Sequence, residues 1–236
     1  MINLKKVFFV VIFLVFYCSV GTIFGQEINR FNKKNERTGV WEKYYQNKRI
    51  RYTGQFKNGK EIGVFKFYDS TSSKHPVIVK TYYNNSDSVF VEFFTIQGKV
   101  KTEGFLNNKK RVGVWKYFNQ NGKIISKENY EDGLLQGEQF VYYPNGQVTE
   151  VSRYKNGSLE GISSKFSSKN ILIEEITYAN NAPNGLAKYF ELNGNLKETG
   201  FYKNGKRDGK WEYYLEGELA TKPNKNKHTN ESFKNK

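Results

Sequence analysis

Residues that could carry chemistry are few and far apart in this chain of 236 residues. Its only cysteine, Cys18, lies in an apolar N-terminal stretch, which argues against disulfides, thiol nucleophiles and cysteine zinc sites. Its two histidines are His75, in a Ser/Thr-rich stretch beside Pro76, and His228, near the C-terminus. A catalytic triad or a histidine metal site would therefore depend on His75 alone, and a lone histidine in a loop is typical of a solvated surface.

Paired carboxylates do not suggest hydrolysis either. Glu174 and Glu175 are adjacent in a stretch that reads as a strand, so their side chains would point to opposite faces and could not flank one substrate bond. The sequence also holds no phosphate loop, dinucleotide fingerprint, zinc-protease helix or nucleophile elbow. We therefore predict no catalytic residue, no cofactor site and no metal site, and we do not expect an enzyme.

Aromatic residues could bind a ligand by stacking, and they make up 17% of the chain. Their spacing is regular because the sequence repeats with a period of 24 residues, with one longer step of 26. A fixed period of this length indicates a repeat array. The position that anchors each of eight copies is occupied by Gly39, Gly63, Val89, Gly113, Gly137, Gly161, Gly185 and Gly209.

Each copy also contains two turns. Asn-Gly recurs nine residues after the anchor, as at Asn121-Gly122, and Asn-Gly or Asp-Gly ends four residues before it, as at Asn58-Gly59. These pairs suit tight turns because both residues tolerate positive φ. Short runs rich in aromatic and β-branched residues lie between the turns and indicate strands. The sequence thus predicts an all-β fold, an elongated single-sheet meander of about eight stacked β-hairpins and about sixteen strands.

Two aromatic columns are expected to pack neighbouring hairpins together. The first, which we call the structural ladder, lies five or six residues after the anchor and comprises Tyr45, Tyr68, Phe94, Phe118, Tyr143, Phe166, Phe190 and Tyr214. The second lies seven residues before the anchor and comprises Phe56, Tyr82, Leu106, Tyr130, Tyr154, Tyr178 and Tyr202. If Phe118 is buried like a core residue, its replacement by alanine should cost about 3 to 5 kcal/mol.

A third column, two residues after the anchor, is large at both ends and small in its later middle: Trp41, Phe65, Val91, Trp115, Gln139, Ser163, Ala187 and Trp211. Packing is the favoured interpretation of this column as well. The alternative is an exposed aromatic strip for a glycan or a partner peptide, because a single sheet can leave one face incompletely covered. The candidate binding strip consists of Trp41, Phe65, Trp115 and Trp211.

The pattern resembles the MORN repeat in its bacterial variant, with the core G-x-W-x-Y-Y-x-x-N-G, of the type often labelled YwqK-family antitoxin. The resemblance is carried by residues 113–122, 137–146 and 205–214 and covers about residues 35–217. The copies at Val89 and Gly161 depart from the pattern. The resemblance implies a meander of stacked hairpins and a role in scaffolding, protein contact or lipid contact, and some bacterial members carry the label of antitoxin.

The two ends of the chain differ from the repeats. Lys5 and Lys6 precede an uncharged apolar run from Val7 to Phe24, which predicts a signal peptide over residues 1–25. An uncleaved membrane anchor is the alternative, because the run approaches spanning length. Residues 26–34 are expected to form a linker, residues 35–219 the repeat domain and residues 220–236 a disordered basic tail.

The formal net charge of +15 allows two interpretations. Lysines in the turns can keep a two-faced sheet soluble and guard its edges, or they can bind an anionic polymer or lipid surface. The favoured function is an exported, non-enzymatic binding or scaffold module of the cell envelope, with a protein or an anionic envelope surface as partner. Export argues against nucleic acid. The alternative is an antitoxin or immunity-type protein that neutralises a toxin by direct contact.

Overall fold

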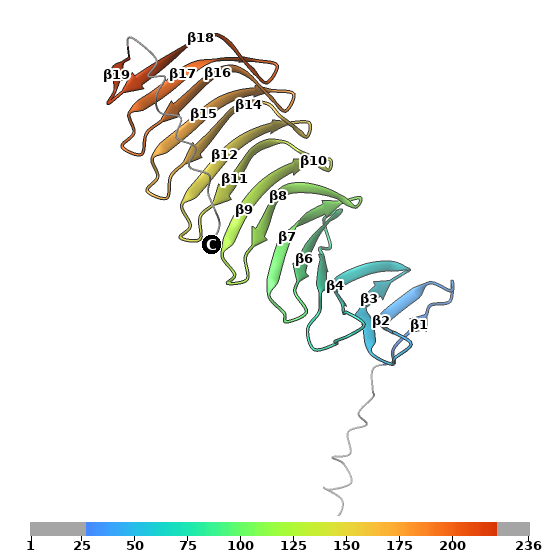
Figure 1. Cartoon of the computed structure of the whole chain (residues 1–236). Coiled ribbons are helices and arrows are strands. Elements are labelled where there is room, and N and C mark those ends of the chain that lie inside the picture. The colour runs from blue at the N-terminus through green and yellow to red at the C-terminus, as the bar shows by residue number, and fades with distance from the viewer. Residues whose placement is uncertain (1–26, 221–236) are drawn as a thin grey trace, which may run out of the picture.

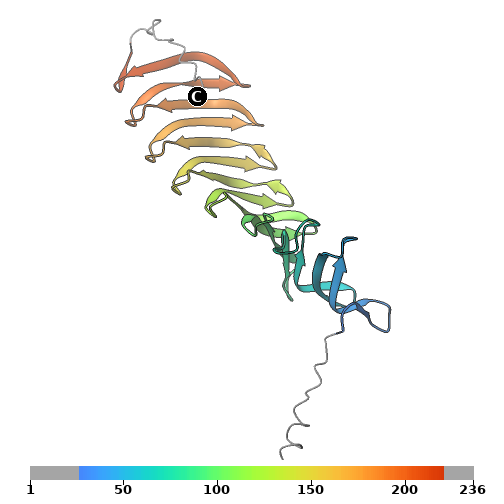
Figure 2. The same cartoon turned by 60° about the horizontal axis from the view of Figure 1, so that its bottom comes forward.

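The computed structural model describes residues 27–220, so the predicted signal peptide and almost all of the predicted tail lie outside the described residues. The described part forms one antiparallel sheet in which consecutive strands pair along the chain. Figures 1 and 2 show these strands, in two views, stacked side by side into a long, curved ribbon. Between residues 27 and 220 no helix is long and apolar enough to cross a membrane. The predicted all-β, single-sheet meander is confirmed.

The sheet has 19 strands, and four of them hold only two residues. The short strands β10 and β13 directly precede β11 and β14, so each repeat still contributes the two main strands that the sequence predicts. In chain order the strands are β1 (Arg30–Phe31), β2 (Arg37–Tyr44), β3 (Ile50–Lys57), β4 (Lys60–Phe67), β5 (Ile78–Tyr82), β6 (Ser88–Phe94), β7 (Val100–Asn107), β8 (Lys110–Phe118), β9 (Ile124–Glu131), β10 (Leu134–Leu135), β11 (Gly137–Tyr142), β12 (Val148–Lys155), β13 (Ser158–Leu159), β14 (Gly161–Phe166), β15 (Leu172–Ala179), β16 (Ala182–Phe190), β17 (Leu196–Lys203), β18 (Lys206–Leu215) and β19 (Glu218–Leu219).

The two long edges of the sheet carry different turns. On one edge two residues connect most strand pairs, and both have positive φ, as at Asn58 (50°) and Gly59 (77°). Such turns match the twist of the strands they join. The exception within the repeats is the connection of β5 to β6, which takes residues 83–87. On the other edge the turn is longer, as where Gly122 N donates to Asn119 O at 3.0 Å. Residues 68–77 form a longer connection between β4 and β5, in the repeat whose step is 26 residues.

The anchor glycine of the repeat marks a bulge. In the pairing of β7 with β8, Glu103 faces Lys116 but Phe105 faces Val112, so three residues of β8 oppose Gly104 alone. Gly113, with φ of 64°, supplies the left-handed conformation that this irregularity needs. Val89 stands at the anchor position of the third copy, and there β5 and β6 pair without any shift. The repeat that lacks the anchor glycine therefore also lacks the bulge.

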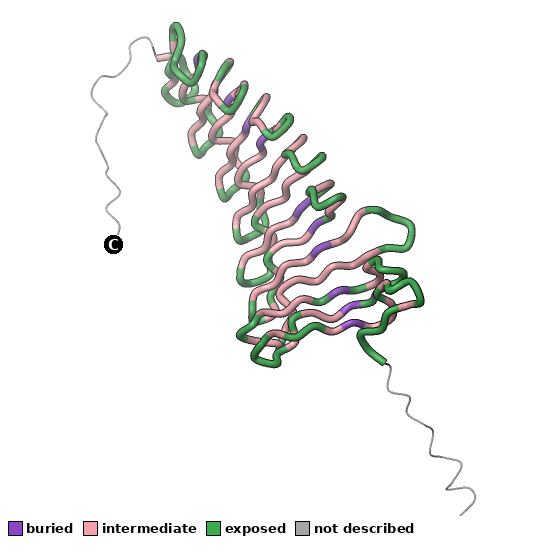
Figure 3. The backbone as a smooth tube through the Cα atoms, turned by 90° about the vertical axis from the view of Figure 1, so that its right-hand side faces the viewer, coloured by how far each residue is buried: buried purple, intermediate pink, exposed green. Residues whose placement is uncertain are grey.

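The sheet is one layer thick, and its two faces differ. We call the face that carries Trp41, Phe65 and Trp115 the core face, and the face that carries Val64, Phe105 and Val114 the open face. Buried residues run along the middle of the strands, as Figure 3 shows. On the core face they form one central row that crosses successive strands. Its buried members are Trp41, Phe65, Val91, Trp115, Ser152, Ser163, Ile176 and Ala187.

Candidate binding surface

Trp115 illustrates how the central row is covered. Its indole is 1% exposed and lies against the backbone of Gly104 on the adjacent strand. The indole Nε1 donates to Phe105 O at 3.0 Å. The Arg111 guanidinium stacks on the other side of the ring, 4.6 Å from its centroid. Because glycine leaves room below and arginine closes the space above, no face of this ring is open to a ligand.

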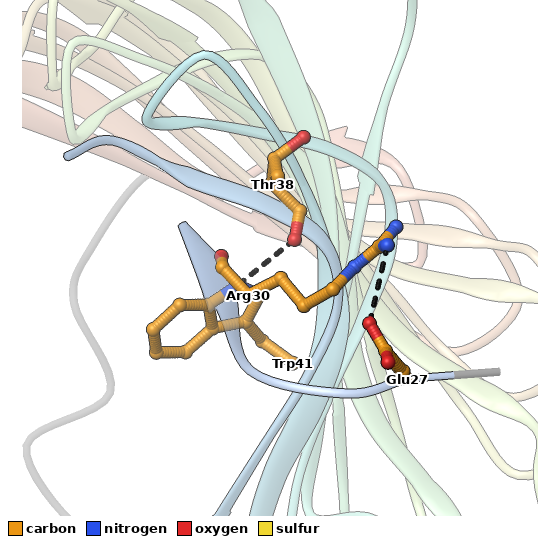
Figure 4. Close-up of polar contacts among 4 residues, drawn as sticks. All are labelled: Glu27, Arg30, Thr38 and Trp41. Carbon is orange, nitrogen blue, oxygen red and sulfur yellow. Dashed lines mark hydrogen bonds and ion pairs between the residues drawn. The ribbon is translucent and has the colours of Figure 1, made fainter. Parts of the chain in front are cut away.

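Trp41 is held in a similar way at the N-terminal end of the sheet. Its Nε1 donates to the carbonyl oxygens of Arg30 at 3.1 Å and Thr38 at 3.2 Å, contacts that tie β1 to β2 (Figure 4). Phe31 meets the indole edge-on at 5.0 Å between ring centroids. Arg37 stacks over the same ring at 4.9 Å. Trp41 is only 9% exposed and serves to close the N-terminal end of the core face.

The other two members of the predicted binding strip also pack against neighbours. Phe65 is fully buried between Phe56 and Tyr82, whose ring centroids lie 5.2 and 5.7 Å away. Trp211 is partly exposed, with Arg207 stacked 4.0 Å above its ring. The expectation of an exposed strip is therefore wrong at Trp41, Phe65 and Trp115. Phe65 and Trp115 fit over glycines of the neighbouring strands, whereas Trp41 is covered by other rings and by Arg37.

The structural ladder turns out to combine two positions. All eight side chains are partly buried. Six of them follow the anchor by five residues, and several of these pair across strands near the strand end, as Phe118 does with Ile124. Tyr45 and Tyr143 follow it by six residues and lie in the turns, where their hydroxyls donate to the carbonyls of Tyr68 at 2.8 Å and Phe166 at 2.9 Å. Phe118 is thus not buried to the extent that a cost of 3 to 5 kcal/mol would require.

In the middle of the sheet the central row becomes polar. Gln139 Nε2 donates to Glu128 Oε1 at 3.2 Å, and the hydroxyls of Ser152 and Ser163 lie 2.9 Å apart. Tyr130 donates its hydroxyl proton to Glu128 Oε2 at 2.6 Å. Burial, helped by hydrogen bonding to Glu128, raises the pKa of Tyr117 well above that of a free phenol. The Tyr117 hydroxyl therefore stays protonated near neutral pH and is not an activated nucleophile.

The residues considered for metal or acid–base chemistry do not converge. Within residues 27–220 no three His, Cys, Asp or Glu side chains form a group that could hold a metal ion. His75 lies against the turn at Gly98, where a Cβ would come within 2.9 Å of the imidazole Cγ. The adjacent carboxylates separate as predicted, since Glu174 binds Lys165 and Glu175 binds Lys188. Cys18 and His228 lie outside the described residues.

Several basic side chains on the edges link neighbouring repeats. Lys99 Nζ donates to Gln120 O at 2.9 Å, and Lys123 Nζ donates to Pro144 O at 2.8 Å, so each lysine caps a carbonyl in the next turn. On the opposite edge Lys110 binds Asp132 at 2.8 Å. Part of the positive charge is therefore used within the sheet, as contacts between turns.

The open face carries the uncovered apolar surface. One residue after the anchor, Val64, Val114, Ile162 and Leu186 are 37% to 52% exposed, and at paired positions Phe105 and Phe201 are 38% and 56% exposed. Polar residues occupy other paired positions, such as Thr81, Asn129 and Thr177. The apolar side chains form two groups separated by a polar stretch in which Glu138 binds Arg153 at 3.3 Å. The N-terminal group comprises Val64, Phe105 and Val114, with the half-buried Phe90, and the C-terminal group comprises Ile162, Leu186 and Phe201.

The open face also carries a row of charges beside its apolar row. Glu92 faces Glu103, Glu103 faces Lys116, and Lys116 faces Lys127 across successive strand pairs. Glu103 binds Lys116 at 2.8 Å. Burial and the neighbouring Glu103 carboxylate raise the pKa of Glu92.

The sequence contains a pattern that identifies the apolar row on the open face. Residues one and two positions after the anchor are neighbours on a strand, so they point to opposite faces. If the aromatic residues two positions after the anchor lie on the core face, the residues one position after the anchor must lie on the open face. These residues are mostly aliphatic and therefore attract less attention than the tryptophans. The candidate binding strip consists of the large rings at the second position. It leaves out the smaller residues at the first position, which lie on the other face.

Comparison with known proteins supports the repeat assignment. The family model described as the MORN repeat variant matches residues 37–58, 111–132, 135–156 and 183–204. No curated protein matches. One matching solved structure is a mutant of S. aureus TarM in complex with fondaparinux, alpha-GlcNAc-glycerol and UDP, 15% identical over 40% of this chain and 19% of that chain. Its TM-score of 0.30 is too low to carry an argument. Four segments of this repeat protein thus match the MORN repeat variant.

Proposed function

We propose that this protein is an exported, non-enzymatic binding module that acts as a scaffold in the cell envelope and holds a protein partner on its open face. The observation that carries the proposal is the apolar row of that face, which the rest of the described chain leaves uncovered. Exposed apolar side chains that gather in one row, bordered by charged residues, are typical of protein contact sites. A binding role also agrees with the repeat family.

The C-terminal group is the segment that we assign to the partner. Leu186 and Phe201 are directly paired on β16 and β17, and Ile162 lies on the same face at β14. Glu175, Lys188, Thr199 and Glu212 form the polar row beside them. An apolar centre with a polar rim is the arrangement that protein interfaces use. The edges of the sheet, which bear most of the free lysines, are the surface through which an anionic envelope polymer or lipid would add to the binding.

The test is capture from envelope extracts with the purified protein as bait. The double variant Leu186→Ser/Phe201→Ser should lose the captured protein, because its apolar contact area is removed. A matched control replaces two exposed apolar residues at the turns, Leu192→Ser and Leu215→Ser, and should retain the captured protein. Equal capture by both variants, with both folded, would contradict the assignment of the open face.

The captured partner also distinguishes the scaffold from the alternative function. An antitoxin or immunity-type protein would capture a toxic protein and suppress its effect when the two are produced together. Export is tested separately by N-terminal sequencing of the native protein, which should begin at Gln26 or Thr22. Recovery of an intact Met1 from the cytosol would overturn export while leaving the binding proposal open to its own test.

A further inference from the structure

We infer that a second copy of this chain docks on the N-terminal segment of the open face, through β5 to β9, in an antiparallel arrangement with its two-fold axis between β7 and β8. This inference goes beyond the proposed function and uses a different segment of the face. Two observations carry it: an aromatic and aliphatic patch on these strands, and a charge row that is complementary to itself.

The patch lies at the centre of the segment. The rings of Phe90 and Phe105 pack together on the open face with centroids 5.0 Å apart. Phe105 pairs with Val112 across β7 and β8, and Val114 on the same strand is 52% exposed. Two such sheets can pack face to face about 10 Å apart, with their inner side chains interdigitated.

The charge row determines which occupant fits. On one copy Glu92 and Glu103 stand side by side on β6 and β7, and Lys116 and Lys127 stand side by side on β8 and β9. Of these four side chains, only Glu103 and Lys116 are joined by an ion pair within residues 27–220. Like charges on neighbouring strands are unfavourable, and they favour an occupant that presents the opposite charges at the same spacing.

A second copy presents those charges in the required order. A two-fold axis parallel to the strands reverses strand order and keeps each residue's position along the strand. With the axis between β7 and β8, Glu92 meets Lys127 of the other copy and Glu103 meets Lys116. Phe105 meets Val112, the residue with which it pairs in its own chain. Moving the axis onto β7 or β8 would place Glu103 against Glu103 or Lys116 against Lys116. The charge row therefore specifies one register.

The arrangement leaves the C-terminal end of the proposed partner site, at Phe201, accessible. From the axis, more strands extend toward the C-terminus than toward the N-terminus. When the strand order is reversed, β17 and β18 extend beyond β1 of the second copy. Phe201, on β17, therefore stays uncovered in the pair, and binding of a partner there does not depend on pairing of the two copies.

The experiment is analytical ultracentrifugation of the full-length protein, whose single chain has a mass of 27.6 kDa. We expect a dimer whose dissociation constant rises at least about tenfold in Glu92→Lys and in Lys127→Glu, since each places like charges in opposition. The double variant Glu92→Lys/Lys127→Glu should restore the dimer. Lys43→Glu makes the same charge change on the core face and should leave the dimer intact.

Circular dichroism of each variant establishes that it is folded before its mass is interpreted. A wild-type protein that stays monomeric up to about 100 µM would overturn the inference, because its dissociation constant would then lie above that concentration. A dimer that neither single variant weakens would place the interface elsewhere and overturn it as well. So would folded single variants whose loss of dimer is not restored in the double variant. Capture of the partner through Leu186 and Phe201 is unaffected in all of these outcomes.

Discussion

Trp115 lies so close to Gly104 that a Cβ atom on Gly104 would come within 2.4 Å of the indole Cδ2. The same fit recurs where Phe65 covers Gly54 and where Trp211 covers Gly200. In each case a large ring occupies the space above a glycine of the adjacent strand, where any other residue would have a side chain. The single-layer sheet thus obtains a core without a second layer.

Gly104→Ala should destabilise the protein by roughly 3 kcal/mol, because the added methyl group has to displace the indole or the backbone. Gly104 does not have positive φ, so the cost comes from the contact and not from backbone strain. Chemical denaturation of Gly104→Ala, Trp115→Ala and the double variant measures this cost in the free energy of unfolding. In the Trp115→Ala background the cost of Gly104→Ala should fall by more than about 1 kcal/mol. Additive costs would show that the two residues do not compete for space.

Trp115→Ala and Phe118→Ala should differ in cost although the residues are three apart on β8. Trp115 is almost fully buried, and its loss should lower the free energy of unfolding by about 3 to 5 kcal/mol. Phe118 is half-buried, and its loss should cost roughly 1 to 2 kcal/mol. Urea denaturation of both variants provides the comparison. A larger cost for Phe118→Ala than for Trp115→Ala would show that the structural ladder, and not the central row, provides most of the packing energy.

Alkaline pH should unfold the protein through its tyrosines. Burial raises the pKa of Tyr117, Tyr154, Tyr178 and Tyr189, and hydrogen bonding to acceptors adds to the effect at Tyr117 and Tyr189. A pKa raised on folding contributes stability that is complete below the unfolded value of about 10 and is lost as the pH rises above it. The melting temperature should therefore fall above about pH 10. Tyr117→Phe should reduce that slope, and an unchanged slope would show that Tyr117 is not part of the effect.

The sequence predicts the hairpin repeat well because its determinants are local. The turn at Asn58-Gly59 and the anchor at Gly113 each need only a few neighbouring residues with special backbone freedom. The burial of Trp115 is different, since it depends on Gly104, a residue of the adjacent strand. Whether a ring faces a glycine or a bulky residue follows from the strand register, and the bulge at each anchor glycine shifts that register by an amount the repeat period does not reveal.

The prediction of an exposed binding strip fails because exposure, too, depends on how the side chains pack. The large rings of Trp41 and Trp115 are the reason these residues belong to the predicted strip. Their exposure, however, depends on Arg37 and Arg111, which stack over them. Conversely, Leu186 and Phe201 are exposed because the sheet has no second layer over the described residues to cover them. The alternation of the strand separates the two sets of residues, but only the packing identifies which set is covered.

In the proposed function, the core face stabilises the sheet and the open face binds the partner. Thiol labelling of two adjacent positions tests it directly, in a background with Cys18→Ser that removes the only natural cysteine. Leu186→Cys should react rapidly, and the captured partner should protect it. Ala187→Cys, at a fully buried position, should react at least about tenfold more slowly, because it requires local opening. Equal rates at the two positions, or no protection of Leu186→Cys by the bound partner, would contradict the account.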